Sequence, residues 1–179
     1  GKPLTILILM YVLTTFVSAF LGSVTTVMIL VPIALLISSE LKISPVPFII
    51  TMAIGSNAGG AATMIGDPPN ILIGSATDYS FIDFIVNLTP PVLVITAASV
   101  GLIWLMYKNK MKVSNEDKAK LMSYNEGNLI KDKKLLYVSL IILGLMLAAF
   151  SVQHLLHLGT ATIAMTAGLV LMLLSDRKR

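Results

Sequence analysis

Long apolar tracts, separated by short polar or basic segments, make up most of this chain. The first tract, residues 4–39, contains no charged side chain. As one helix it would be about 54 Å long, well beyond the roughly 30 Å hydrocarbon core of a bilayer, so it has to fold back. Small residues interrupt the tract at Gly22-Ser23. We therefore predict a hairpin of two helices, either two short spans or a re-entrant hairpin.

The second apolar tract, residues 45–77, contains the sequence Gly66-Asp67-Pro68-Pro69-Asn70. Consecutive prolines remove two backbone donors and disfavour helix in the residue before them. A continuous helix cannot pass through this point, so the tract is predicted to be a broken helix. A short helix lying in the membrane interface is expected next, over residues 78–89, because its apolar residues recur at helical spacing.

Three more spans and one polar loop complete the prediction. A span over residues 90–107 ends in Trp104 and Tyr107, side chains suited to a membrane–water interface. Residues 108–134 form a lysine-rich loop with some helix near 116–122. The remainder, 135–179, is read as two spans, over 135–156 and 161–174.

Composition supports an all-α membrane protein. Hydrophobic residues make up 56% of the chain and charged residues only 12%, whereas soluble domains carry about 25% charged residues. There is no cysteine and there are only two histidines, so we expect no disulfide, zinc site, cysteine nucleophile or cofactor. Because the chain starts at Gly1 rather than at methionine, we expect it to be a piece of a longer protein.

The basic residues predict the orientation. If the chain changes sides at each predicted crossing, all 13 lysines and arginines fall on one side. Short loops rich in Lys and Arg stay in the cytoplasm. We therefore expect a multi-pass protein of the cytoplasmic membrane, in contact with the lipid bilayer and with its basic loops inside. The lysine loop has little aromatic interleaving, so nucleic acid is not an expected partner.

Asp67 is the strongest candidate for chemistry, because an acidic group at membrane depth is costly unless it meets a cavity, a partner or an ion. The alternative is an outer-surface turn, for which Asp-Pro-Pro is also suited. The segment before it is unusually small and polar, with Ser56, Asn57 and Thr63. Its Gly55-x-x-x-Gly59 step alone would indicate close helix packing.

Hydroxyl groups surround the predicted hairpin turn, with Ser18, Ser23, Thr25 and Thr26 close to Gly22. They could supply oxygen ligands to Na⁺ or donors to an oxyanion. Alternatively, they bond to carbonyls of their own helix, as is common for Ser and Thr in membrane helices. The residues alone leave both interpretations open.

Two motifs carry a family resemblance. Residues 18–27 (SAFLGSVTTV) and 55–73 (GSNAGGAATMIGDPPNILI) resemble the ion transporter superfamily. The similarity is to its citrate-transporter-like branch, which includes the arsenical pump membrane protein, the P protein and NhaD-type sodium/proton antiporters. The branch usually has Asp-Asn where this chain has Gly22-Ser23.

The resemblance implies half of an inverted-repeat fold. Residues 1–107 would be the transport elements of the first repeat, and 135–179 would lead into the second repeat. Homodimers are typical of the family. The tips of the hairpin and of the broken helix would bind ion and substrate without a cofactor, through Na⁺ or H⁺ coupling, and a sodium ion could be held by Ser23, Asn57 and Asp67. The candidate binding residues are Ser18, Gly22, Ser23, Thr25, Ser56, Asn57, Thr63, Gly66, Asp67, Pro68, Pro69 and Asn70.

Several functions agree with this pattern. The first is a secondary active transporter that moves an anion or arsenite, and the second is a sodium/proton antiporter. A non-transporting membrane scaffold subunit is an alternative of another class. An intramembrane aspartyl protease is disfavoured because Asp67 has no acidic partner at membrane depth. We therefore do not expect the protein to be an enzyme.

Overall fold

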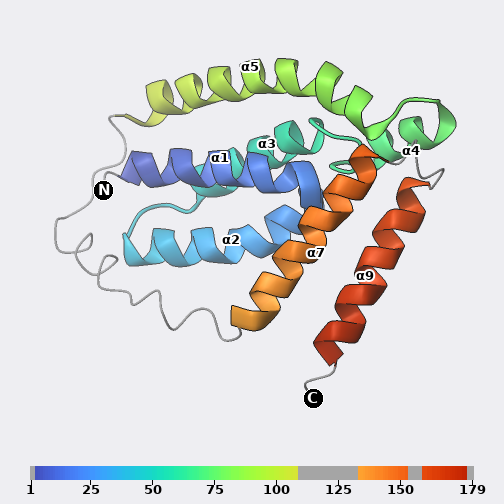
Figure 1. Cartoon of the computed structure of the whole chain (residues 1–179). Coiled ribbons are helices and arrows are strands. Elements are labelled where there is room, and N and C mark those ends of the chain that lie inside the picture. The colour runs from blue at the N-terminus through green and yellow to red at the C-terminus, as the bar shows by residue number, and fades with distance from the viewer. Residues whose placement is uncertain (1–2, 109–132, 153–158, 177–179) are drawn as a thin grey trace. The chain divides into compact units, whose positions relative to one another are not determined.

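The computed structural model describes residues 3–108, 133–152 and 159–176, and within these ranges all regular structure is helical (Figure 1). The helices are α1 (Pro3–Leu21), α2 (Ser23–Glu40), α3 (Val46–Gly60), α4 (Pro68–Ala76), α5 (Phe81–Tyr107), α7 (Lys133–Ser151) and α9 (Thr160–Asp176). Among them α1, α2 and α5 are long and apolar enough to cross a bilayer. The predicted all-α membrane fold class is confirmed.

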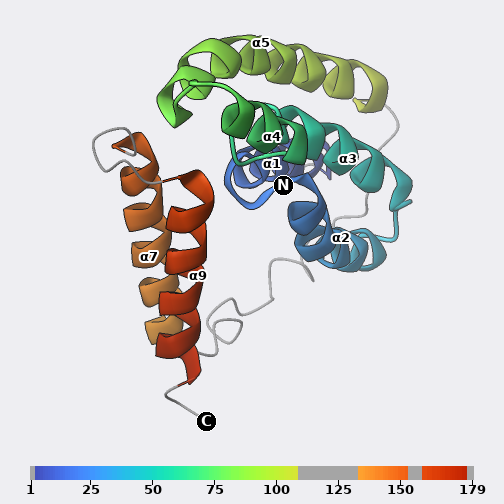
Figure 2. The same ribbon diagram turned by 90° about the vertical axis from the view of Figure 1, so that its right-hand side faces the viewer.

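The chain divides into two compact units. The first contains α1, α2, α3 and nearly all of α5, and the second contains α7 and α9. In the first unit α3 packs against both α1 and α2, and Figures 1 and 2 show α1 and α3 side by side. The core of this unit is built from Leu7, Met10, Tyr11, Leu30, Ala34, Phe48, Met52 and Ile103. Apolar side chains also cover the surface: Val24 is 70% exposed and Met28 is 72% exposed, as expected for helices that face lipid.

Gly22 makes the hairpin turn between α1 and α2. Its φ angle is 80°, in the left-handed region that glycine reaches without the steric cost of a Cβ atom. The Gly22 N–H donates to the Ser18 carbonyl (3.2 Å), and its carbonyl accepts from the Thr26 N–H (3.1 Å). The first bond belongs to the end of α1 and the second to the start of α2. One residue therefore ends one helix and begins the next, as the sequence predicted.

Gly55 and Gly59 are the points at which α3 comes closest to α1. A Cβ atom added at Gly59 would lie 1.9 Å from the Thr15 carbonyl oxygen, and one added at Gly55 would lie 3.0 Å from the Tyr11 carbonyl oxygen. Small residues let helix backbones approach in this way. The packing interpretation of this GxxxG step is confirmed.

The break in the second tract begins earlier than predicted. Helix α3 ends at Gly60, residues 61–67 form turns, and α4 begins at Pro68. We call residues 61–67 the break. The prediction placed it at 66–70 and treated the two prolines as the interruption. Proline is instead favoured in the first turn of a helix, where its missing N–H costs no hydrogen bond. Pro68, Pro69 and Asn70 therefore start α4.

The predicted division between an interfacial helix over 78–89 and a span over 90–107 is wrong. A single helix, α5, runs from Phe81 to Tyr107 and contains Pro90 and Pro91. Two prolines remove only two helical hydrogen bonds, and membrane helices tolerate such losses. At the end of α5 the Lys108 ammonium lies 4.5 Å from the centre of the Trp104 ring, an arrangement that suits a membrane–water interface.

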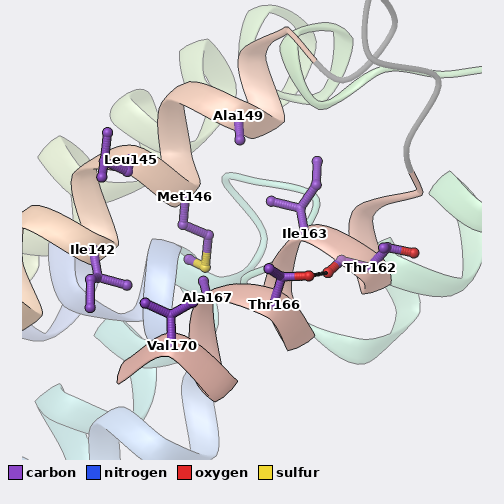
Figure 3. A pocket seen from close by; sticks show the side chains of 9 residues that line it. All are labelled: Ile142, Leu145, Met146, Ala149, Thr162, Ile163, Thr166, Ala167 and Val170. Carbon is purple, nitrogen blue, oxygen red and sulfur yellow. Dashed lines mark hydrogen bonds between the residues drawn. The ribbon is translucent and has the colours of Figure 1, made fainter. Parts of the chain in front are cut away.

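In the second unit α7 and α9 lie side by side and run in opposite directions (Figure 2). A hollow of about 280 Å³ between them is lined mainly by apolar side chains, together with two threonines (Figure 3). The Thr166 hydroxyl donates to the Thr162 carbonyl at 2.8 Å, so it is engaged by its own helix. The helix expected near 116–122 lies outside the described residues, as do residues 153–158, where the span predicted over 135–156 ends.

We expect Gly59→Ala to destabilise the protein by roughly 1–3 kcal/mol, because its methyl group would overlap the backbone of α1. Gly101→Ala is the matched control: it also places alanine inside a helix, but nothing lies within 4 Å of its added Cβ. Thermal unfolding of both variants in detergent measures the difference. Equal melting temperatures would contradict the close approach of α3 to α1.

Candidate functional site

Two kinds of hydroxyl contact occur in the described part of this protein. Some bond to a carbonyl one turn earlier in their own helix, as do Thr14 (to Met10, 2.6 Å) and Thr15 (to Tyr11, 2.9 Å). Others reach a different segment of the chain. Four hydroxyls of the second kind are those of Ser18, Ser23, Thr63 and Thr89. Each of the four either belongs to the break or bonds to α3 or to the break, so these four long-range contacts gather in one region.

The tip of the hairpin touches the break. The Ser23 hydroxyl donates to Oδ1 of Asp67 at 2.5 Å. A Cβ atom added at Gly22 would lie 3.5 Å from the Gly66 carbonyl oxygen, so the two backbones are in van der Waals range here. Residues 44 positions apart in the chain are thus brought into one site.

Two glycines make room for the Asp67 carboxylate. A Cβ atom added at Gly60 would lie 2.5 Å from Oδ2 of Asp67. One added at Gly66 would lie 2.3 Å from the Gly60 carbonyl oxygen. A larger residue at either position would push the carboxylate or the last turn of α3 aside. The sequence Gly60 to Asp67 can therefore close into a compact turn against the hairpin tip.

Helix α1 is fastened to α3 and to the break by two further hydroxyls. The buried Ser18 hydroxyl donates to the Ser56 carbonyl at 2.6 Å, and the Thr63 hydroxyl donates to the Ala19 carbonyl at 2.5 Å. The Ser56 hydroxyl donates within its own helix, to the Ala53 carbonyl (3.0 Å). These bonds hold the last turn of α1 beside the break, which positions the hairpin tip.

Side chains from α4 and α5 complete the surroundings of the break. The Asn70 amide donates to the carbonyls of Thr63 (2.8 Å) and Ala61 (3.4 Å). The Thr89 hydroxyl donates to the Ala62 carbonyl at 3.3 Å. Backbone carbonyls that have left a helix are costly to bury without a donor. Here the three consecutive carbonyls of residues 61, 62 and 63 each accept a hydrogen bond from a side chain.

The structure brings together most of the residues selected from the sequence. Contacts at the hairpin tip and the break involve Ser18, Gly22, Ser23, Ser56, Thr63, Gly66, Asp67 and Asn70. Four selected residues, Thr25, Asn57, Pro68 and Pro69, are instead exposed. The predicted sodium ligands Ser23 and Asp67 are adjacent, but Asn57 is not beside them. Its side chain lies off the buried face of α3, which includes Ser56 and Gly59.

Three residues with a place in this region were not among the candidate binding residues. Gly60 faces the Asp67 carboxylate, and Thr89 donates to the break. Thr26 is fully buried and its hydroxyl has no hydrogen-bond partner. It lies one turn along α2 from Ser23, which a helical projection of residues 23–40 would have indicated.

The chemistry available here is that of oxygen ligands. Asp67 supplies one carboxylate, Ser23 a hydroxyl, and the break its carbonyls. In the described part of the chain no group of three or more His, Cys, Asp or Glu side chains could hold a metal ion. Hard cations such as Na⁺ prefer oxygen donors, whereas soft metals prefer thiolates. The arrangement therefore suits a proton or a weakly held hard cation.

Comparison with known proteins places the chain in a family. The profile of the citrate transporter family matches residues 1–179. A 46 kDa membrane protein of Mycobacterium leprae is 37% identical over 179 residues, covering 100% of this chain and 42% of that protein. An uncharacterised transporter of Mycobacterium tuberculosis is 37% identical over 180 residues, with the same two coverages. The P protein of mouse is 29% identical over 127 residues, covering 68% of this chain and 15% of that protein.

The chain thus spans 42% of the length of the first two relatives. No solved structure matches it significantly. The family is one of transporters rather than enzymes, so the protease interpretation is set aside. The resemblance of the two motifs to the citrate-transporter-like branch is confirmed, and the chain belongs to the citrate transporter family.

Proposed function

We propose that the full-length protein is a secondary active transporter that moves a small anion, such as a carboxylate, together with a cation or proton bound at Asp67. The observation that carries the proposal is the contact between the hairpin tip and the break. The Asp67 carboxylate accepts a hydrogen bond from Ser23, and its neighbours in the break, Gly66 and Ile65, bring no charge. An acidic group placed among backbone turns is the usual form of an ion site in transporters with broken helices.

The charges of the site argue for a bound cation. No lysine or arginine lies between Lys42 and Lys108 in the sequence. Helix α4, which starts next to Asp67, has proline at its first two positions, and proline has no N–H to offer an anion. An anion approaching this half-site would therefore meet the negative charge of Asp67 without compensation. A cation on Asp67 removes that repulsion, so we expect the cation to bind first.

The orientation follows from the basic residues. We place the protein in the cytoplasmic membrane with its lysine-rich loop inside, since all 13 basic residues then share one side. The Lys108–Trp104 contact at the end of α5 supports an interface at that position. A homodimer, expected from the family, remains part of this proposal.

Sodium/proton antiport is the second candidate. It is favoured by the single carboxylate at the site, because one carboxylate can bind Na⁺ and H⁺ in alternation without any anionic substrate. Arsenite transport is a further possibility within the first class. A non-transporting scaffold subunit would conserve the packing of the break but show no cation dependence.

We expect Asp67→Asn to abolish cation-dependent uptake in proteoliposomes containing the full-length protein, with radiolabelled citrate as the probe. The amide keeps the shape of the side chain and can still pair with Ser23, but it has no charge to bind a cation. The loss should be about tenfold or more. Asp78→Asn is the matched control, because Asp78 is exposed and outside the break. Equal uptake by the wild type and the Asp67 variant would refute the ion site.

Proton movement driven by a Na⁺ gradient, with no anion added, separates the two candidates. For the proposed anion transporter we expect no Na⁺-driven signal in a pH-sensitive dye assay. A signal that disappears with Asp67→Asn would establish antiport instead. If neither citrate uptake nor proton movement occurs, arsenite uptake is tested next, and its absence would leave the scaffold interpretation.

A further inference from the structure

Two sets of carbonyl groups in the break differ in the donors available to them. The first set, at Ala61, Ala62 and Thr63, accepts hydrogen bonds from side chains of Asn70 and Thr89. These donors come from different helices, α4 and α5, and together they cover three consecutive positions. Such coverage satisfies the carbonyls, which leaves them poorly suited to bind an ion.

The second set, at Ile65 and Gly66, has no helical donor. The residue four positions after Ile65 is Pro69, which has no N–H. The Asn70 N–H, which would bond to the Gly66 carbonyl in a regular helix, bonds instead to the Asp67 carbonyl at 3.1 Å. These two carbonyls directly precede Asp67 in the chain. Because they neighbour Asp67 in the chain and lack a helical donor, we expect these two backbone oxygens to join its carboxylate around a cation.

Thr89 is unusual in making its bond across the molecule. Threonines inside other helices, such as Thr14 and Thr51, bond to a carbonyl four residues earlier in their own helix. Thr89 lies inside α5 and could do the same, but its hydroxyl donates to Ala62, 27 positions away. It is followed directly by Pro90 and Pro91. Val92, on the next turn of α5, packs with Ala19 and Ala62, so this part of α5 lies against the break.

We propose that Thr89 and Asn70 are positioning residues that set the cation affinity of the Asp67 site. By holding the carbonyls of residues 61–63, they fix the course of the break, so that the ligands are Asp67, Ser23 and the backbone at 65–66. This inference rests on the proposed function, because it assumes that Asp67 binds a cation. It adds α5 to the site through Thr89, whose hydroxyl bonds to the break at Ala62.

The test compares Thr89→Val with Thr89→Ser in the full-length protein. Valine keeps the shape of threonine but has no donor, whereas serine keeps the hydroxyl. Citrate uptake is titrated against Na⁺ at fixed pH, and against pH at fixed Na⁺, in proteoliposomes. We expect T89V to raise the half-saturating cation concentration about 3- to 10-fold, the effect of losing one hydrogen bond. The maximal rate should stay within about twofold, and T89S should titrate like the wild type.

Asn70→Ala provides a second variant in case T89V fails to insert in the membrane. It removes the other donor and should shift the titration in the same direction. The inference is overturned if both variants titrate like the wild type, or if both lower the maximal rate without moving the cation dependence. The Asp67→Asn variant distinguishes a failure of this inference from a failure of the proposed function. If Asp67→Asn loses cation dependence while T89V and Asn70→Ala do not change it, the positioning role alone is wrong.

Discussion

The hydrogen bond between the Ser23 hydroxyl and the Asp67 carboxylate is the contact on which the rest of this structure depends. It joins the tip of a helical hairpin to the point where a second helix breaks. Both segments leave helical geometry, and in apolar surroundings backbone groups that do so need other partners. The structure meets this need locally, with hydroxyls and an amide from four helices and the break itself. Among these groups, the Ser23 hydroxyl also holds the one carboxylate of the second tract.

The glycines explain how these segments can come so close. Gly59 brings α3 against the backbone of α1, and Gly60 and Gly66 fold the break around the carboxylate. Gly22 supplies the left-handed turn that brings Ser23 to the same place. Packing and candidate chemistry are therefore not separate features here. The small residues that permit close helix contact also create the room in which Asp67 lies.

Features set by local backbone chemistry could be predicted from the sequence. The hairpin turn at Gly22 and a break near Asp67 follow from glycine and proline, whose effects act within a few residues. The same reasoning failed where proline was treated only as an interruption. Pro68 begins a helix, and Pro90 and Pro91 lie inside one, because a helix loses little at its first turn and membrane helices tolerate missing bonds.

Which of two neighbouring polar residues faces the protein interior depends on the angular position of each residue around its helix axis. Ser56 lies on the buried face of α3 and Asn57, one residue later, is exposed. Thr26 is likewise buried on α2, whereas Thr25 is exposed. A projection of each helix could have separated these pairs, since consecutive residues point about 100° apart. Thr89 could not have been found in this way. Its role depends on a contact between segments 27 residues apart, which periodicity within one helix does not report.

The most direct test of the account is a double-mutant cycle on the contact between hairpin tip and break. The free energy of unfolding is measured in detergent for the wild type, Ser23→Ala, Asp67→Ala and the double variant. The account predicts a coupling of about 1 kcal/mol or more between the two sites, because each single change disturbs the same hydrogen bond. Effects that add to within about 0.5 kcal/mol would show that Ser23 and Asp67 act independently, which would contradict the contact.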